Sequence, residues 1–337
     1  MHSPTDHPYK TWIDLAASRL GGQTLACSDD FFAEMENLLK PDAPVFIDGK
    51  YTDRGKWMDG WESRRKREVG FDWCVIKLGA KGKIHGVNVC TRFFAGNAPQ
   101  KVSIEGCCET GAPNEATQWF DVLPLTEVKP DSDNFFDIPQ QDVVTHVRLN
   151  IHPDGGVARL RLYGEPVIDW NWFLPNEPVD LVYVKNGGRP LACSDMFFSN
   201  MENLIMPNRG KDMGDGWETK RRRGGRPCDW IIVKMGATGS IKKVVVDTAH
   251  FKGNFPESFS LQAINMKDGS DPEENAKWED VIVRQKLTAD AEHFYKEEVL
   301  SGEREFTHIK LNMFPDGGIS RLRVFGYPSA SVIGQGE

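Results

Sequence analysis

A chain of 337 residues is long enough for two domains that each bury a hydrophobic core without disulfides or metals. Its 49 acidic residues outnumber its 41 lysines and arginines, and the resulting net charge of −8 argues against a general nucleic-acid binder. No stretch approaches the roughly 20 apolar residues of a membrane span, and the N-terminus has no apolar run typical of a signal peptide. We therefore expect a cytoplasmic protein with seven reduced cysteines and neither a membrane nor a nucleic-acid partner.

The elements predicted along the first half of the chain are mostly short strands. Residues 30–39 form the one helical stretch, with Ser28 or Asp29 as its cap. Strands follow at 73–78, 83–90 and 101–105, and polar and apolar residues alternate in the strands 146–152 and 159–163, on either side of the turn PDGG. Several short strands separated by turns are typical of a β-sandwich or jelly roll.

The second half of the chain repeats the first in the same order. Three pairs of segments show this: LACSDDFFAEMENL at 25–38 and LACSDMFFSNMENL at 191–204, DGWESRRKR at 59–67 and DGWETKRRR at 215–223, and THVRLNIHPDGG at 145–156 and THIKLNMFPDGG at 307–318. The period is far too long for a solenoid, so a whole domain is duplicated. The sequence predicts an all-β protein of two tandem jelly-roll domains at 13–166 and 179–329, with a linker at 167–178.

The basic run after Asp-Gly-Trp-Glu is the most specific candidate site. Four positive charges in a row in an acidic protein indicate a local anion site, because a guanidinium group matches a carboxylate with two hydrogen bonds. The alternative is a solvated basic loop. Trp61 and Trp217 either floor a pocket or pack in the core. The candidate anion ligands are Arg64, Arg65, Arg221 and Arg222.

The polar face of the predicted hairpin is the second candidate. If Val147, Leu149 and Ile151 face the core, then His152 and its polar neighbours face the other way, together with two arginines of the next strand. An ordinary solvent-facing surface is the alternative. The arginines of this face are Arg159 and Arg161 in the first copy and Arg321 and Arg323 in the second.

The Gly-Asn segment, with Asn97 in the first copy and Asn254 in the second, is the third candidate. The copies differ here, because His250 takes the place of a phenylalanine and His152 of the first copy is replaced by Phe314. A histidine suits proton transfer near neutral pH. Either the two sites are unequal or one site draws on both copies, although a lone histidine is more often structural.

No motif of a known cofactor site is present. The sequence has no His-Glu-x-x-His, no Walker loop and no Gly-x-Ser-x-Gly elbow. Asp247 and His250 alone do not make a metal site. We predict no cofactor; a divalent metal is the alternative, and the ligand spacing does not support it.

The doubled LACSDxFF, DGWE[ST] with its basic tail, Gly-Asn and NxxPDGG[VI][AS]RLR motifs resemble those of the allantoicase family over nearly the whole chain. The resemblance implies two jelly-roll domains related to galactose-binding-like folds and a homo-oligomer, a trimer or hexamer. It also implies hydrolysis of allantoate to ureidoglycolate and urea in allantoin and purine degradation, by a hydrolase acting on C–N bonds of linear amidines.

That reaction replaces one urea on the central carbon of allantoate by hydroxyl, so it needs a cation for the carboxylate, a base for water and an acid for the departing nitrogen. We assign the carboxylate to the arginines of the basic run and the ureido groups to the two asparagines and to Asp72 or Asp229. Glu62 or Glu218 is our choice for proton transfer, with His250 or His152 as the rival. Arginines beside the glutamate should lower its pKa and make it a base, with a histidine as the acid.

Two other functions fit the same sequence. Tandem jelly rolls also serve as non-catalytic, lectin-like ligand-binding modules, because a fold does not fix a function. A hydrolase of a related ureide is the other possibility. Release of urea from allantoate by the pure protein separates these readings.

Overall fold

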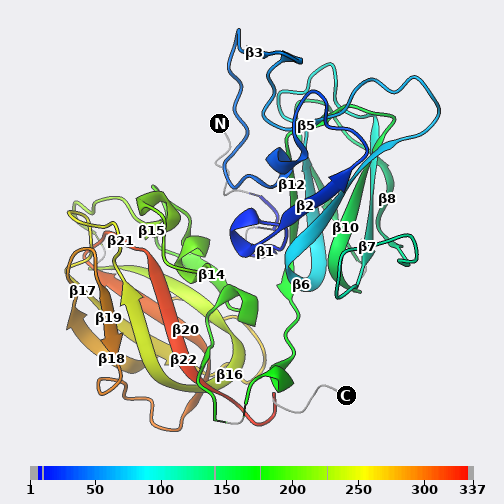
Figure 1. Cartoon of the computed structure of the whole chain (residues 1–337). Helices are drawn as coiled ribbons and strands as arrows, with labels where there is room; N and C mark the ends of the chain where they lie inside the picture. The colour runs from blue at the N-terminus through cyan, green and yellow to red at the C-terminus, as the bar shows by residue number, and fades with distance from the viewer. Residues whose placement is uncertain (1–6, 10, 140–141, 175, 226, 333–337) are drawn as a thin grey trace. The chain divides into compact units, whose positions relative to one another are not determined.

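The computed structural model describes residues 7–9, 11–139, 142–174, 176–225 and 227–332. The chain divides into two units, residues 1–167 and 168–337, here called unit 1 and unit 2 (Figure 1). None of the described residues forms an α-helix, and the part of the chain that the structure describes has no helix long and apolar enough to cross a membrane. The protein is therefore all-β, as the sequence predicts.

Each unit is built from strands and short 3-10 helices. Those of unit 1 are β1 (Ile13–Asp14), η1 (Ser18–Leu20), β2 (Gln23–Cys27), η2 (Met35–Leu39), β3 (Tyr51–Thr52), β4 (Gly55–Lys56), β5 (Trp61–Glu62), β6 (Asp72–Cys90), β7 (Lys101–Cys107), β8 (Phe120–Glu127), β9 (Asp133–Asp137), β10 (Val143–His152), β11 (Gly156–Val157) and β12 (Arg159–Pro166). After η3 (Trp170–Trp172), those of unit 2 are β13 (Val179–Asp180), η4 (Val184–Asn186), β14 (Arg189–Cys193), η5 (Met201–Ile205), η6 (Met213–Asp215), β15 (Trp217–Glu218), β16 (Asp229–Asp247), β17 (Ser258–Ile264), β18 (Glu279–Lys286), β19 (Glu292–Tyr295), β20 (Glu305–Phe314), β21 (Gly318–Ile319) and β22 (Arg321–Pro328).

One 19-residue strand runs through both layers of each sandwich. In unit 1 the first half of β6 pairs with β2 and β10, and its second half pairs with β12 and β9. Unit 2 repeats this arrangement around β16, with β14 and β20 on the first half and β22 and β19 on the second (Figure 1). The strands predicted at 73–78 and 83–90 are thus the two halves of β6. Gly79 lies between them, where a Cβ would come within 2.6 Å of Leu20, so only glycine allows the crossing.

The predicted helix at 30–39 is wrong except for its last turn, η2. The N–H groups of Phe32 and Ala33 donate to the carbonyl oxygen of Glu62 and hold this segment against β5. Ser28 does not cap a helix, because its hydroxyl donates to Asp72 at 2.9 Å. Tertiary hydrogen bonds therefore override an apolar spacing that fits a helix.

The inward-facing residues of the sandwich form the core of each unit. In β10 the side chains of Val147, Leu149 and Ile151 are fully buried, as the alternation predicts. The other face of β10 is also covered, because His146 and Asn150 are only 2% and 3% exposed. The polar face of the hairpin is therefore not an ordinary solvent-facing surface.

Each unit buries a histidine at the same place, His146 on β10 and His308 on β20. Burial lowers the pKa of both, to about 4 for His308, although a hydrogen bond to Asp271 opposes the shift. In the unfolded chain His308 binds a proton near pH 6.5, whereas in the folded chain it does so only near pH 4. The neutral, buried form of His308 therefore gives its full contribution to stability above pH 6.5, and this contribution is lost as the pH falls towards 4. We expect the thermal midpoint to fall across this window, and to fall less in a His308→Gln variant. Melting curves at several pH values between 7 and 4 measure this; equal slopes for the two proteins would contradict it.

Candidate functional site

Three motifs that are far apart in the sequence meet in unit 2. The N–H of Thr219, next to the Glu of Asp-Gly-Trp-Glu, donates to the carbonyl oxygen of Gly317 at 3.0 Å. Gly317 belongs to the Pro-Asp-Gly-Gly turn, and the N–H of the next residue, Gly318, donates to the carbonyl oxygen of Asn254 at 2.9 Å. Backbone hydrogen bonds therefore bring the basic run, the turn and the Gly-Asn segment together.

Unit 1 joins its copies of the motifs in the same way. The N–H of Ser63 donates to Gly155 at 3.1 Å, and the N–H of Gly156 donates to Asn97 at 2.8 Å. The first glycine of each turn has a positive φ, +131° at Gly155 and +135° at Gly317, and a Cβ there would lie 2.5 Å from the asparagine carbonyl oxygen. The turn needs glycine both for its backbone angle and for this close approach.

A glutamate and an asparagine form a hydrogen-bonded pair in each unit. Asn254 donates to Oε1 of Glu218, and Asn97 donates to Oε1 of Glu62 at 2.7 Å. Burial raises the pKa of Glu62, although the hydrogen bond from Asn97 opposes it. The expectation that neighbouring arginines lower the pKa of this glutamate is therefore wrong for unit 1, because those guanidinium groups are not its partners.

Two of the four side chains in the basic run of unit 2, Arg221 and Arg223, form no ion pair with the residues that the structure describes. Lys220 pairs with Asp195 at 3.4 Å, and Arg222 pairs with the buried carboxylate of Asp229. Arg221 lies between them and forms no ion pair with the residues that the structure describes. Its guanidinium group is thus available to an anionic ligand.

Unit 1 shows the same alternation along its basic run. Arg64 pairs with Asp29 at 2.7 Å and Lys66 pairs with Asp72 at 2.8 Å. Arg65 lies between them and, within the described ranges, has no carboxylate partner. Arg65 is therefore an exposed guanidinium group between two cations that are held by aspartates.

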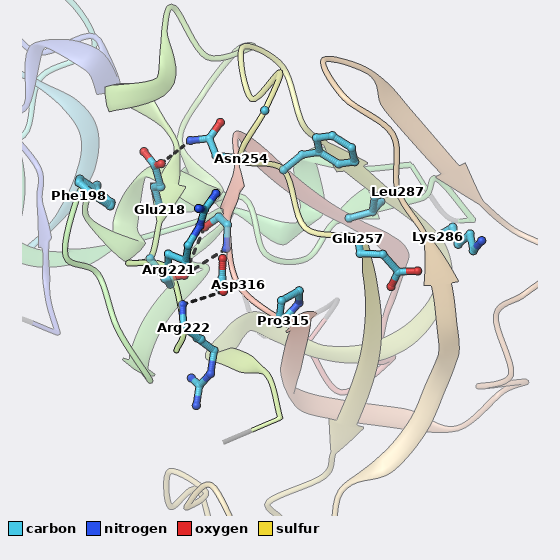
Figure 2. A pocket seen from close by; sticks show the side chains of 14 residues that line it. Phe198, Glu218, Arg221, Arg222, Asn254, Glu257, Lys286, Leu287, Pro315 and Asp316 are labelled. Atoms are coloured by element: carbon cyan, nitrogen blue, oxygen red, sulfur yellow. Dashed lines mark hydrogen bonds between the residues drawn. The ribbon is translucent and has the colours of Figure 1, made fainter. Parts of the chain in front are cut away.

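A hollow of about 820 Å³ opens beside the Glu–Asn pair of unit 2, a size that suits a small molecule. Figure 2 shows Glu218 with Asn254 on one side of it, next to Arg221 and Asp316. An acceptor, a donor and a free cation thus share one hollow. Its wall also includes Phe198, Arg222, Phe255, Glu257, Lys286, Leu287 and Pro315.

The two aspartates proposed for ureido groups lie below the surface instead. Asp72 and Asp229 are 2% and 1% exposed, and each accepts a hydrogen bond from a serine hydroxyl, Ser28 at 2.9 Å and Ser194 at 2.8 Å. Asp72 also pairs with Lys66, and Asp229 pairs with Arg222. These contacts fix the basic run of each unit in place. The carboxylates are positioned to hold the loop rather than a ligand.

The hairpin arginines lie away from the Glu–Asn pairs. Arg159, 3% exposed, contacts Asp59 at 2.6 Å, and Arg321, 4% exposed, contacts Asp215 at 2.8 Å. The four hairpin arginines line other hollows: Arg159 and Arg161 one of about 700 Å³ in unit 1, and Arg321 and Arg323 one of about 340 Å³ in unit 2. The remaining two make longer contacts of 3.6 Å, Arg161 with Asp14 and Arg323 with Asp180.

Neither candidate histidine lines the hollow of unit 2. Nε2 of His250 lies 2.8 Å from the carbonyl oxygen of Gly210, and its backbone N–H donates to Asp290. The ring of His152 contacts that of Phe71 at a tilt of 38°, with ring centres 4.8 Å apart, and burial lowers the pKa of His152. The His250 ring thus contacts a backbone carbonyl oxygen, whereas the buried Nε2 of His152 has no hydrogen-bond partner among the described residues.

The two tryptophans of the motif pack in the core. Trp61 and Trp217 are fully buried, and their indole N–H groups donate to the carbonyl oxygens of Asp29 and Asp195 at 2.9 Å. They hold the segment that carries the aspartate partner of the basic run. They do not floor a pocket.

Sequence reasoning missed the wall that β18 contributes. Lys286 and Leu287 lie at the end of this strand, and Glu257 faces them from the start of β17. No sequence motif identifies Lys286, Leu287 or Glu257. An alignment of the two copies places Lys286 at the position of Glu127 and shows that the charge differs there. Among the described residues, no group of three or more His, Cys, Asp or Glu side chains is placed to hold a metal ion.

Comparison with known proteins places both units in one family. Residues 13–167 and 179–329 each match the family described as "Allantoicase repeat". The chain is 48% identical over 324 residues to a "Probable allantoicase" of Stutzerimonas stutzeri, covering 95% of this chain and 97% of the relative. A relative of the same description from Pseudomonas aeruginosa is 48% identical over 326 residues, with the same coverage. The crystal structure of allantoicase from Saccharomyces cerevisiae has a TM-score of 0.80 and 37% identity, covering 94% of this chain and 93% of that one.

Proposed function

The chain belongs to the allantoicase family, and from this we propose that it hydrolyses allantoate to ureidoglycolate and urea in the hollow of unit 2. It is a hydrolase of allantoin and purine degradation, acting on C–N bonds of linear amidines. The convergence of Glu218, Asn254 and the unpaired Arg221 in one hollow carries the assignment of the site.

Arg221 binds the carboxylate of allantoate. Two arginines of the basic run, Arg221 and Arg223, have no ion pair among the described residues, and Arg221 is the one that lines the hollow. It therefore gives up no such ion pair when the anion binds. Its neighbours Lys220 and Arg222 are held by aspartates, which fixes the loop from which it extends. A planar guanidinium group on a fixed loop offers two parallel hydrogen bonds to a carboxylate.

Glu218 transfers the protons. Of the carboxylates lining the hollow, Glu257 is bound by Arg284 at 2.9 Å and Asp316 accepts the backbone N–H of Arg222 at 2.8 Å. Glu218 is bound by the neutral amide of Asn254, which orients it without supplying a charge. It removes a proton from water as the C–O bond forms, and returns it to the ureido nitrogen as the C–N bond breaks, so the carboxylate is unchanged after each turnover.

The histidine expected as the acid is not needed in this scheme. One carboxylate acting first as base and then as acid balances the reaction. Asn254 and the backbone around the Pro-Asp-Gly-Gly turn offer hydrogen bonds to the ureido groups.

The experiment that tests the function is incubation of the pure protein with allantoate, followed by assays for urea and ureidoglycolate. Equal release of the two products supports the proposal. Binding of a sugar with no release of urea would support the lectin-like alternative, and turnover of another ureide alone would support the related hydrolase.

We expect turnover without an added metal or organic cofactor. The hollow offers a base, a cation and amide groups, and the described residues provide no cluster of metal ligands. Dialysis against EDTA should leave kcat within about twofold of the untreated protein, since no step uses a Lewis acid. Loss of activity on dialysis, with recovery on adding one divalent metal, would contradict this prediction.

We also propose that the enzyme acts in the cytoplasm as a homo-oligomer, a trimer or hexamer. The family to which the chain belongs supports the assembly. All seven cysteines are free, which fits a reducing compartment. Light scattering of the eluted protein measures the mass of the assembly, and fractionation of cells measures the location.

A further inference from the structure

The two units share the Glu–Asn pair and the exposed arginine but differ in the wall around them. The strand register fixes the correspondence: Lys286 of β18 pairs with Ser258 of β17, and Glu127 of β8 pairs with Lys101 of β7. Both units therefore place a charged residue at the end of the same strand. The charge is positive in unit 2 and negative in unit 1.

The surrounding charges preserve this difference. In unit 2 the nearby Glu257 is bound by Arg284 at 2.9 Å, and Lys286 forms no ion pair with the described residues, although its charge also helps to lower the pKa of Glu257. In unit 1 the carboxylate of Glu127 is 3.8 Å from the ammonium group of Lys101. An anion entering unit 2 meets the cation Lys286 in addition to Arg221, whereas the matching position of unit 1 carries a carboxylate.

The apolar part of the wall differs as well. Phe255 follows Asn254 and lines the hollow of unit 2. The matching residue of unit 1, Ala98, packs against the small cluster of Met58, Cys90 and Phe94. A large aromatic side chain next to Asn254 thus gives the hollow of unit 2 an apolar surface, which Ala98 does not give to unit 1.

From these differences we propose that turnover takes place in unit 2 alone, and that Lys286 is the residue that draws the anionic substrate to it. The inference rests on the proposed function. Arg221 binds the carboxylate directly, and Lys286, on the opposite side of the hollow in Figure 2, adds attraction at longer range. Unit 1 keeps the Glu62–Asn97 pair but has neither the positive charge nor the phenylalanine at the matching positions.

A matched pair of arginine variants tests which unit reacts. Arg221 and Arg65 are both exposed and outside the ion pairs of the described residues, so replacing either by alanine leaves the fold intact. We expect Arg221→Ala to lower kcat/KM at least about a hundredfold, because a charge-assisted contact to the substrate is lost. Arg65→Ala should keep kcat/KM within about twofold of the unmodified protein, since it touches no reacting substrate.

A second matched pair tests the role of Lys286. Lys286→Glu gives unit 2 the charge of unit 1, and we expect KM to rise about tenfold while kcat stays within about twofold, because the change acts on approach and binding. Added salt at about 0.5 M should shrink that difference by screening the charge. The control, Glu127→Lys, gives unit 1 the charge of unit 2 and should leave both constants as they are.

The outcomes separate this inference from the function itself. If the unmodified protein releases no urea from allantoate, the proposed function fails. If it releases urea but Arg65→Ala and Arg221→Ala lose similar activity, turnover is shared and the inference is overturned. If Lys286→Glu lowers kcat rather than raising KM, or matches Glu127→Lys, the role given to Lys286 is wrong.

Discussion

Replacing Glu218 by glutamine is expected to lower kcat about a thousandfold, within the range by which a positioned acid–base group accelerates proton transfer. Glutamine keeps the size of the side chain and an oxygen that accepts the hydrogen bond from Asn254. It has no proton affinity near neutral pH, so water is no longer activated. KM should change little, because Arg221 and the wall of the hollow still bind the substrate.

Glu62→Gln is the matched control, since Glu62 forms the same pair with Asn97 in unit 1. We expect this variant to keep kcat within about threefold of the unmodified enzyme, because its site lacks the cationic wall. Initial rates of urea release, with circular dichroism to confirm the fold, measure both variants. If both keep full turnover while folded normally, neither glutamate is the proton carrier and the assignment falls.

The duplication is the part of the architecture that the sequence reveals most fully. Matching segments in the same order in both halves require two copies of one fold, and the alternation at 146–152 correctly places Val147, Leu149 and Ile151 in the core. The long strands β6 and β16 could not be predicted as single elements. Whether two strands are halves of one depends on the close approach at Gly79, which no local pattern records.

The candidate site was found as a set of motifs, but the role of each member needed the structure. In the run from Lys220 to Arg223 every residue is basic, and nothing local distinguishes Arg221 from Arg222. The distinction comes from Asp195 and Asp229, which hold Lys220 and Arg222 and lie in other segments of unit 2. Chemistry that depends on contacts far apart in sequence cannot be assigned from spacing alone.

A second expected result concerns Arg159, which the sequence places on a polar face and the structure places in the interior. Its guanidinium group donates to Asp59 and to the carbonyl oxygens of Asp42 and Ala158, and its side chain is 3% exposed. We expect Arg159→Met to lower the free energy of unfolding by about 3 kcal/mol, because breaking a buried pair leaves a buried carboxylate without its main partner. We expect a loss of unfolding free energy near the lower end of the range for buried ion pairs, because Lys40 still contacts Asp59 at 3.1 Å.

Arg64→Met provides the comparison at an exposed pair. The side chain of Arg64 is 63% exposed and its contact with Asp29 is largely screened by water, so the loss of stability should be much smaller than for Arg159→Met. Urea denaturation of the two variants measures both changes in the free energy of unfolding. A double variant, Arg159→Met with Asp59→Asn, should recover part of the loss, because it removes the uncompensated charge. If Arg159→Met instead leaves stability unchanged and raises KM, this arginine binds substrate and the structural role given to it here is wrong.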